Sequence, residues 1–256
     1  MSAITKDDVR TYDSKVPEVS LAFWVIKIAA TTLGETAGDA VSMSMNLGYL
    51  AGTAIFAVFF LAAVLVQVKA QKFHPFLYWT TIIATTTVGT TLADFSTRSL
   101  GIGYAGGSCL LLALLLAALF TWQRTLGSIA VESVSTPKAE VFYWVTIMFS
   151  QTLGTALGDW TADSAGFGYL GSALLFGLLL TLIALAYWLT AIARTILFWS
   201  AFILTRPLGA VVGDFLDKPH DHGGLELSRY GASLALLLFM GVCILLIPQR
   251  AAAKSH

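Results

Sequence analysis

Long apolar stretches alternate with short polar connections along the chain, and this pattern predicts membrane-spanning helices. The apolar runs 47–68, 101–122, 166–188 and 230–247 are 18 to 23 residues long, enough to cross a hydrocarbon core of about 30 Å. The other apolar segments share their length and bring the predicted number of helices to eight. The predicted helices cover residues 22–42, 47–68, 76–96, 101–122, 141–162, 166–189, 194–214 and 229–248.

One residue pattern occurs four times and predicts an internal repeat. Each copy has an aromatic residue and a Trp, a Gly ten residues after the Trp, and an Asp fifteen residues after it. Two helices per copy mean that every copy enters the membrane in the same direction, which predicts a pseudo-fourfold axis along the membrane normal. Corresponding Asp residues of the first and third copies, and of the second and fourth, are 120 positions apart, which favours a duplicated pair of two-helix units. The repeated residues are Trp24, Trp79, Trp144 and Trp199, and Asp39, Asp94, Asp159 and Asp214.

Composition and charge place the chain among integral membrane proteins. Hydrophobic residues make up 57% and charged residues 12%, and the mean hydropathy of +0.77 excludes an ordinary soluble domain. A net charge of zero argues against a nucleic-acid partner. The polar, mixed-charge N-terminus predicts no cleaved signal peptide. The predicted organisation is an N-terminal tail at 1–20, two repeats at 21–122, a linker at 123–140, two repeats at 141–248 and a C-terminal tail at 249–256.

Lys and Arg residues gather on the side of the predicted bundle that holds both chain ends. By the positive-inside rule, the tails and the linker are therefore expected in the cytoplasm. This orientation puts the repeat Trp residues at the cytoplasmic surface of the membrane, where they are interpreted as interface anchors. Lys27 lies near the same surface and is interpreted as a side chain that extends to the headgroups.

Polar residues recur on one face of the first helix of every copy. Positions four and eight before each Asp share its helix face, and the intramembrane carboxylates should face the bundle interior or a water-filled cavity. The four Asp residues are therefore expected to converge on a central axis. The resulting stripes are Thr31-Glu35-Asp39, Thr86-Thr90-Asp94, Gln151-Thr155-Asp159 and Arg206-Ala210-Asp214.

This pattern predicts a path for cations. Five acids with hydroxyl groups offer hard oxygen ligands for Mg²⁺, Ca²⁺ or Mn²⁺. The deep Arg206 is expected to pair with Glu35, Asp39 or Asp94 and to act as a tethered cation that competes with the transported ion. The predicted metal ligands are Asp39, Asp94, Asp159, Asp214 and Glu35, and the predicted pathway or gating residues are Thr31, Thr86, Thr90, Gln151, Thr155 and Arg206.

A second reading assigns the acids a structural role in a membrane scaffold or accessory protein. In that reading the Asp residues pair with Arg98, Arg206 and Arg229 and hold the bundle together. A water-connected cavity that reaches the Asp residues favours transport, whereas a dry, Arg-paired centre favours the scaffold. The cluster of His220 and His222 in the outer loop is explained by loop polarity or by metal binding. No nucleophile with its base and no phosphate-binding or dinucleotide motif is present, so an enzyme is not expected.

The fourfold pattern resembles the bacterial membrane family that is built from the repeat of unknown function 347. The resemblance rests on the aromatic-Trp pair, the Gly, the Gly-Asp or Ala-Asp pair and the following Gly-Tyr, and it covers residues 21–247. It implies a multi-pass protein of the bacterial inner membrane but no activity. The sequence thus predicts an all-α, eight-span bundle that transports or conducts cations, with Mn²⁺ as the candidate ion. Its expected partners are the lipid bilayer and a metal ion, and a homo-oligomer is compatible with the sequence.

Overall fold

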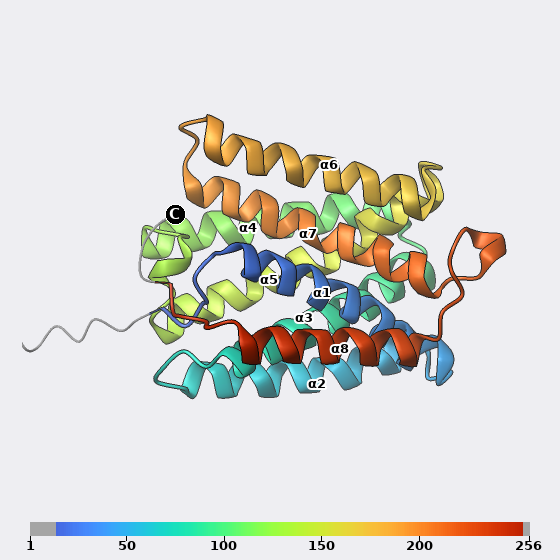
Figure 1. Ribbon diagram of the computed structural model, residues 1–256, viewed down its shortest axis with the longest axis horizontal. Helices are drawn as coiled ribbons and strands as arrows, with labels where there is room; N and C mark the ends of the chain where they lie inside the picture. Colours follow the sequence, from blue (N-terminus) through green and yellow to red (C-terminus); the bar gives the residue numbers. More distant parts are fainter. Residues whose placement is uncertain (1–13, 253–256) are drawn as a thin grey trace, which may run out of the picture.

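The computed structural model describes residues 14–252 as a bundle of eight long α-helices joined by short connections (Figure 1). The helix bounds agree with the predicted spans to within four residues at each end. The described residues form no β-strand, which confirms the all-α fold class. The helices are α1 (Leu21–Asp39), α2 (Gly48–Lys69), α3 (Pro75–Asp94), α4 (Tyr104–Leu126), α5 (Pro137–Asp159), α6 (Gly168–Leu189), α7 (Arg194–Asp217) and α8 (Arg229–Leu246).

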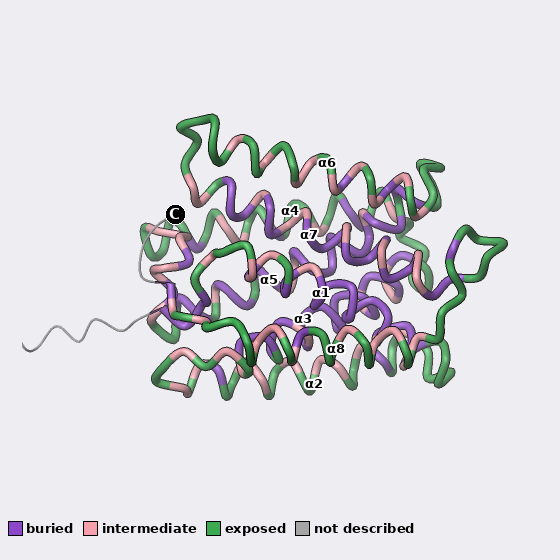
Figure 2. The backbone as a smooth tube through the Cα atoms, in the orientation of Figure 1, coloured by how far each residue is buried: buried purple, intermediate pink, exposed green. Residues whose placement is uncertain are grey.

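Four helices form an inner ring and four cover it. The odd-numbered helices pack in the cyclic order α1, α3, α5, α7, and α7 packs back onto α1. The outer helix of each copy covers the inner helix of the next copy, so that α2 lies on α3, α4 on α5 and α6 on α7, while α8 closes the ring on α1. Figure 2 shows the consequence, because buried backbone concentrates in the inner helices and exposed backbone in the outer ones.

The inner and outer helices differ in composition because they face different surroundings. Five helices, α2, α4, α6, α7 and α8, are long and apolar enough to cross a membrane. The remaining three, α1, α3 and α5, carry Thr, Ser, Gln and acidic residues on faces that the bundle buries. The outer helices expose Leu, Phe and Val instead. This inside-out distribution of polarity is that of an integral membrane protein.

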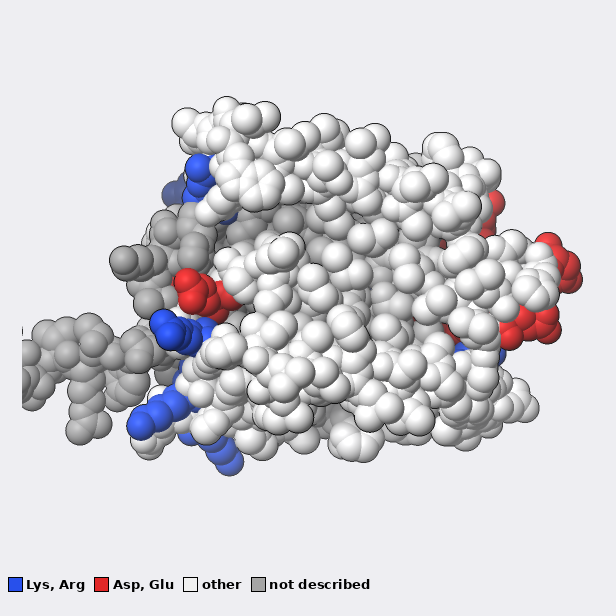
Figure 3. Space-filling model, viewed as in Figure 1, with Lys and Arg blue, Asp and Glu red and all other residues white. Residues whose placement is uncertain are grey.

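Charged side chains lie at the two ends of the bundle and leave the visible flank uncharged (Figure 3). Lys and Arg gather at the end where the described chain ends lie, referred to below as the basic end. Asp and Glu are visible at the opposite, acidic end. Each inner helix begins at the basic end of the bundle and runs towards the acidic end. The repeat Asp of each copy therefore lies close to the acidic end.

The chain ends and the central connection pack together at the basic end. The amide of Lys15 donates to the Val134 carbonyl at 3.1 Å, and the amide of Ala252 donates to the Val16 carbonyl at 2.8 Å. Lys15 also forms a buried ion pair with Glu140 at 2.6 Å. The connection between α4 and α5 covers 127–136, inside the segment 123–140 expected as a linker, and it is packed against the bundle.

Three of the four repeat Trp residues belong to the protein interior. Trp79, Trp144 and Trp199 are exposed by 0, 2 and 4% and join an aromatic core at the basic end. The Trp79 indole donates to Gln249 Oε1 at 2.7 Å, and the Trp199 indole donates to the Ile129 carbonyl at 2.9 Å. The interpretation of these three residues as membrane-surface anchors is therefore wrong, because packing between copies covers them. Trp24 alone is only partly buried.

Candidate functional site

Repeated glycines bring the inner helices into close contact. A Cβ atom on Gly34 would lie 2.3 Å from Thr86 Oγ1, and one on Gly209 would lie 2.1 Å from Thr31 Oγ1. Gly89 and Gly154 meet Gln151 and Arg206 in the same way. In every case the Gly five residues before one Asp faces the residue eight before the next Asp around the ring. The glycines therefore allow close helix packing, the role that small residues serve in membrane helices.

This packing buries every predicted site residue within the bundle. The polar residues four and eight before the Asp residues are exposed by at most 2%, and the four Asp residues by at most 3%. The first three Asp residues are each the last residue of an α-helix and are followed by a π-helical turn, Ala40–Ser44, Phe95–Ser99 or Trp160–Ser164. Such π-helical turns are frequent at functional sites. In the fourth copy α7 continues as an α-helix to Asp217.

Arg206 joins several copies at the centre of the bundle. Its Nη2 donates to Glu35 Oε2 at 2.9 Å and to the hydroxyls of Thr90 and Thr155, and its Nη1 donates to the Thr31 carbonyl at 3.3 Å. These contacts come from α1, α3 and α5, so the guanidinium of an α7 residue occupies the middle of the ring. Of the three acids predicted as its partner, Glu35 is confirmed.

Two cationic side chains bridge the four Asp residues in pairs. Lys218 Nζ lies 2.5 Å from Asp39 Oδ2 and 3.0 Å from Asp214 Oδ1. Arg98 lies 2.9 Å from Asp94 Oδ1 and 3.1 Å from Asp159 Oδ2. Each cation follows the Asp of its own copy by four residues and reaches the Asp of the next copy. The corresponding residues of the first and third copies are Met43 and Asp163, so cations alternate around the ring.

The Asp residues belong to two different groups. The carboxylates of Glu35, Asp39 and Asp214 each place an oxygen atom within 4.8 Å of the others, and all three are buried. Among the described residues this is the one group of acids, His or Cys with the spacing of a metal site. Asp94 and Asp159, also predicted as ligands, lie outside this group and share Arg98. Carboxylate oxygens are suitable ligands for hard divalent cations.

Lys218 remains charged in this setting. Burial lowers the pKa of Lys218, but the carboxylates of Asp214, Asp39 and Asp217 outweigh burial, and the pKa lies well above its ordinary range. A second cation, Arg229, binds Asp217 at 2.9 Å and approaches Asp39 at 3.9 Å. Sequence reasoning missed Lys218 as a site residue. The available signal was its spacing of four residues from Asp214, which brings two side chains together on a helix.

Lys27 lies inside the ring rather than at the membrane surface. Its side chain is fully buried, and its Nζ is 4.2 Å from the ring centroid of Phe202. No hydrogen-bond acceptor for this Nζ exists among the described residues. The prediction that Lys27 extends to the headgroups is wrong, because Lys27 is twelve residues before Asp39 and shares the inward stripe. The amide of Gln151 is likewise buried without a partner in the described chain.

The centre is closed and paired rather than open. A groove of about 450 Å³ between α1, α6 and α7 is lined by none of the five predicted acidic ligands. The carboxylates instead contact Arg98, Arg206 and Lys218. In the outer loop His220 and His222 are exposed, and within 14–252 they belong to no metal-binding group. This arrangement has the Arg-paired centre that the scaffold reading expects.

Comparisons with known proteins agree with the repeat geometry. The repeat of unknown function DUF347 matches residues 22–73, 77–128, 142–193 and 197–248. Each match contains one inner and one outer helix. Comparison with curated proteins and with solved structures finds no match. Because the four matches cover most of the sequence, the chain belongs to the family of proteins built from the DUF347 repeat.

Proposed function

We propose that the protein transports or conducts cations across a membrane, with a divalent metal ion, Mn²⁺ in the first place, as its cargo. The observation that carries the proposal is the buried group of Glu35, Asp39 and Asp214, whose carboxylate oxygens lie within 4.8 Å of one another. Ionisable groups inside a membrane protein are costly and usually mark ion pathways. Packing alone would be served as well by apolar residues of similar volume.

The charge of the central cluster favours a divalent ion. Five carboxylates, one Glu and four Asp, pair with Arg98, Arg206 and Lys218. Arg229 also approaches Asp39, but its charge is matched by that of Asp217, so this pair adds no net charge. With all of these groups ionised, two negative charges are left over, the charge that one divalent cation neutralises. Carboxylate and hydroxyl oxygens also suit Mn²⁺, Mg²⁺ and Ca²⁺ better than soft metals.

Lys218 and Arg206 act as tethered cations in this proposal. An ion that enters from the acidic end displaces Lys218 from Asp39 and Asp214 and takes its place between the carboxylates. Arg206 closes the path on the side of this site that faces the basic end, because its guanidinium donates hydrogen bonds to Glu35, Thr90 and Thr155. Passage requires the guanidinium to leave the middle of the ring, so the described arrangement is a closed state.

The membrane arrangement of the proposal follows the charge distribution. All eight helices cross the bacterial inner membrane around a pseudo-fourfold axis along its normal, and both termini face the cytoplasm. The Lys and Arg residues at the basic end support this orientation by the positive-inside rule. In this orientation the four repeat Asp residues lie towards the outer surface of the membrane.

A scaffold without transport is the second candidate, and the paired centre favours it. Arg98 and Lys218 each bridge inner helices of two copies, and Arg206 links α7 to α1, α3 and α5. Such bridges fix the register of the ring without any bound ion. The two candidates differ in whether the acids bind an external cation.

Flux into liposomes distinguishes the candidates. Purified protein is reconstituted, Mn²⁺, Mg²⁺ or Ca²⁺ is added outside, and an entrapped fluorescent indicator reports entry. We expect entry of one ion to exceed that in protein-free liposomes, and Asp39→Asn to abolish the excess. The control Asp163→Asn removes an exposed carboxylate of the third copy and should keep the flux. If the parent carries none of these ions, the transport proposal fails and the scaffold stands.

A further inference from the structure

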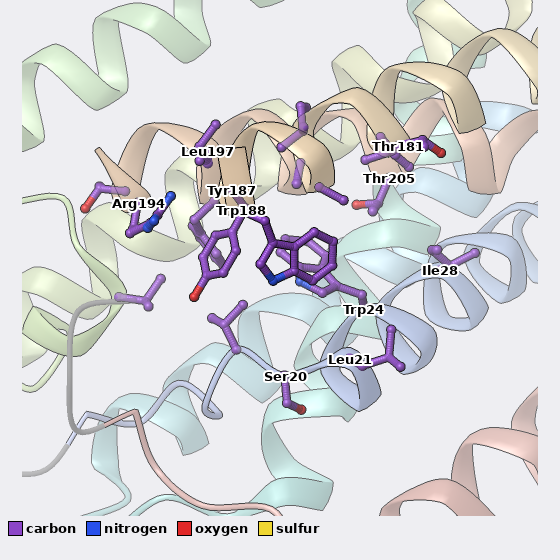
Figure 4. A pocket seen from close by; sticks show the side chains of 18 of the residues that line it. Ser20, Leu21, Trp24, Ile28, Thr181, Tyr187, Trp188, Arg194, Leu197 and Thr205 are labelled. Atoms are coloured by element: carbon purple, nitrogen blue, oxygen red, sulfur yellow. The ribbon is translucent and has the colours of Figure 1, made fainter. Parts of the chain in front are cut away.

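A groove opens on the flank of the bundle near its basic end. It has a volume of about 450 Å³ and is bounded by α1, α6 and α7. Figure 4 shows Trp24 and Ile28 of α1 facing Tyr187 and Trp188 of α6 across it. Its volume falls within the range of about 300–1,000 Å³ that is usual for small-molecule sites.

The internal repeat provides a closed counterpart of this groove. Tyr187 corresponds by repeat position to Trp122, and Trp24 corresponds to Trp199. The rings of Trp122 and Trp199 are in contact, with centroids 5.8 Å apart, and both residues are buried. No aromatic contact among the described residues joins Tyr187 to Trp24. The same architecture is thus filled between α4 and α7 and left open between α6 and α1.

A smaller side chain contributes to the opening. Ala184 lines the groove, whereas the corresponding residue of the second copy, Leu119, packs against the aromatic core. The exposure of Trp188, 73%, adds a large apolar surface beside the groove. In a membrane protein, such an exposed apolar surface contacts the acyl chains of lipids.

We infer that this groove binds one membrane phospholipid, with an acyl chain between α1 and α6 and the phosphate against Arg194. The inner lining is apolar, and the charged groups of the groove, Arg194 and Glu132, come from the basic end. Arg194 is the first residue of α7, and the ends of helices that cross a membrane meet the headgroups. A guanidinium pairs well with phosphate, and the Glu132 carboxylate suits the ammonium of phosphatidylethanolamine.

The groove reaches the interface between the inner helices of the first and fourth copies. Such an interface between the inner helices of two neighbouring copies is called a joint below. Thr205 lines its inner wall, and the Thr31 hydroxyl donates to the Thr205 carbonyl at 3.2 Å across the contact of α1 and α7. The next residue is Arg206. A bound acyl chain therefore lies beside the helix contact that carries the central ion pair. The inference rests on the membrane embedding of the bundle and is independent of cation transport.

Quenching of tryptophan fluorescence by a phosphatidylethanolamine with brominated acyl chains tests the inference. The lipid is titrated into purified protein in a nonionic detergent, where Trp24 and Trp188 report contact with bromine. We expect a saturable phase at about one lipid per protein. Ala184→Leu, which copies the closed counterpart, should remove this phase. Arg194→Gln should raise the half-saturating lipid concentration by about tenfold, since a charge-assisted hydrogen bond is lost.

Ala117→Leu is the matched control, because Ala117 is exposed on the outer face of α4 and its substitution should leave the saturable phase unchanged. Far-ultraviolet circular dichroism and size exclusion verify that each variant is folded. Unchanged saturation in both Ala184→Leu and Arg194→Gln overturns the inference. So does a parent that is a dimer and an Ala184→Leu variant that is a monomer, because the groove then holds a second copy of the chain.

Discussion

Two joints of the Asp ring have the same geometry but different chemistry. Between the second and third copies, Arg98 bridges Asp94 and Asp159. Between the fourth and first copies, Lys218 bridges Asp214 and Asp39 in the corresponding way. The second joint adds the carboxylate of Glu35, where the other joint has only Thr hydroxyls four residues before its Asp residues.

The difference bears on where the proposed ion site would lie. One bridging cation neutralises half of the charge of two carboxylates and is enough to hold two helices together. A third buried carboxylate increases the cost of the site and requires Arg206 as a further partner. If Arg206 or Lys218 moves away, the three carboxylates are left with an excess of negative charge. A cation that enters the cluster would neutralise this excess. Within the proposed function, we therefore place the ion site at the joint of the fourth and first copies.

The largest expected effect comes from Arg206→Met. The change leaves Glu35 as a buried carboxylate without its partner, which should lower the free energy of unfolding by about 3–5 kcal/mol. Gln151→Met is the matched control, because Gln151, like Arg206, lies eight residues before the Asp of its copy, and its amide has no partner among the described residues. This substitution should lower the free energy of unfolding by less than about 1 kcal/mol. Denaturant titration in mixed micelles measures both. Equal losses would contradict the central role of the ion pair.

Alanine at the repeated glycines should distinguish the joints by sterics. A Cβ at Gly209 would lie 2.8 Å from a backbone atom of Thr31, whereas one at Gly89 would lie 3.1 Å from backbone atoms of the third copy. We expect Gly209→Ala to cost about 3 kcal/mol and Gly89→Ala about 1 kcal/mol, measured by thermal unfolding. Gly241→Ala, with open space around its Cβ position, is the control and should be neutral. The reverse order of the first two variants would show that the joint of the fourth and first copies can open without strain.

Pairs at the rim should contribute least. Arg229→Gln replaces the charged partner of the buried Asp217 by an amide that can still donate a hydrogen bond to it, and Lys218 stays nearby. We therefore expect a loss of about 1 kcal/mol in unfolding free energy. On the other joint, the Tyr104 hydroxyl donates to Asp163 at 3.3 Å in an exposed position, and Tyr104→Phe should change stability by less than about 0.5 kcal/mol. Losses above those of Gly209→Ala would move the centre of the site outwards to this rim.

The repeat made the fold predictable from the sequence. The constant distance from Trp to Asp fixed the inner helices, and the stripe of positions four and eight before Asp39 placed the polar residues inside the ring. The i,i+4 relation of Asp214 and Lys218 was visible, but whether a loop lysine turns inwards depends on the tertiary position of residues 218–228. Trp199 was misinterpreted because the sequence around a Trp at a helix end is the same whether its indole faces lipid or packs against another residue, here Trp122. Lys27 was misinterpreted because its apolar neighbours give no sign of which helices surround it.

The most direct test of the ion site compares Lys218→Gln with Arg98→Gln in the presence of divalent cations. Each substitution removes the bridging cation of one joint, and thermal unfolding is recorded in chelator and in millimolar Mn²⁺, Mg²⁺ or Ca²⁺. We expect one cation to stabilise Lys218→Gln, by about 2.7 kcal/mol at a hundredfold excess over its dissociation constant, and to leave Arg98→Gln unchanged. If both variants are equally destabilised and no cation restores either, the acids are structural and the account of an ion site is contradicted.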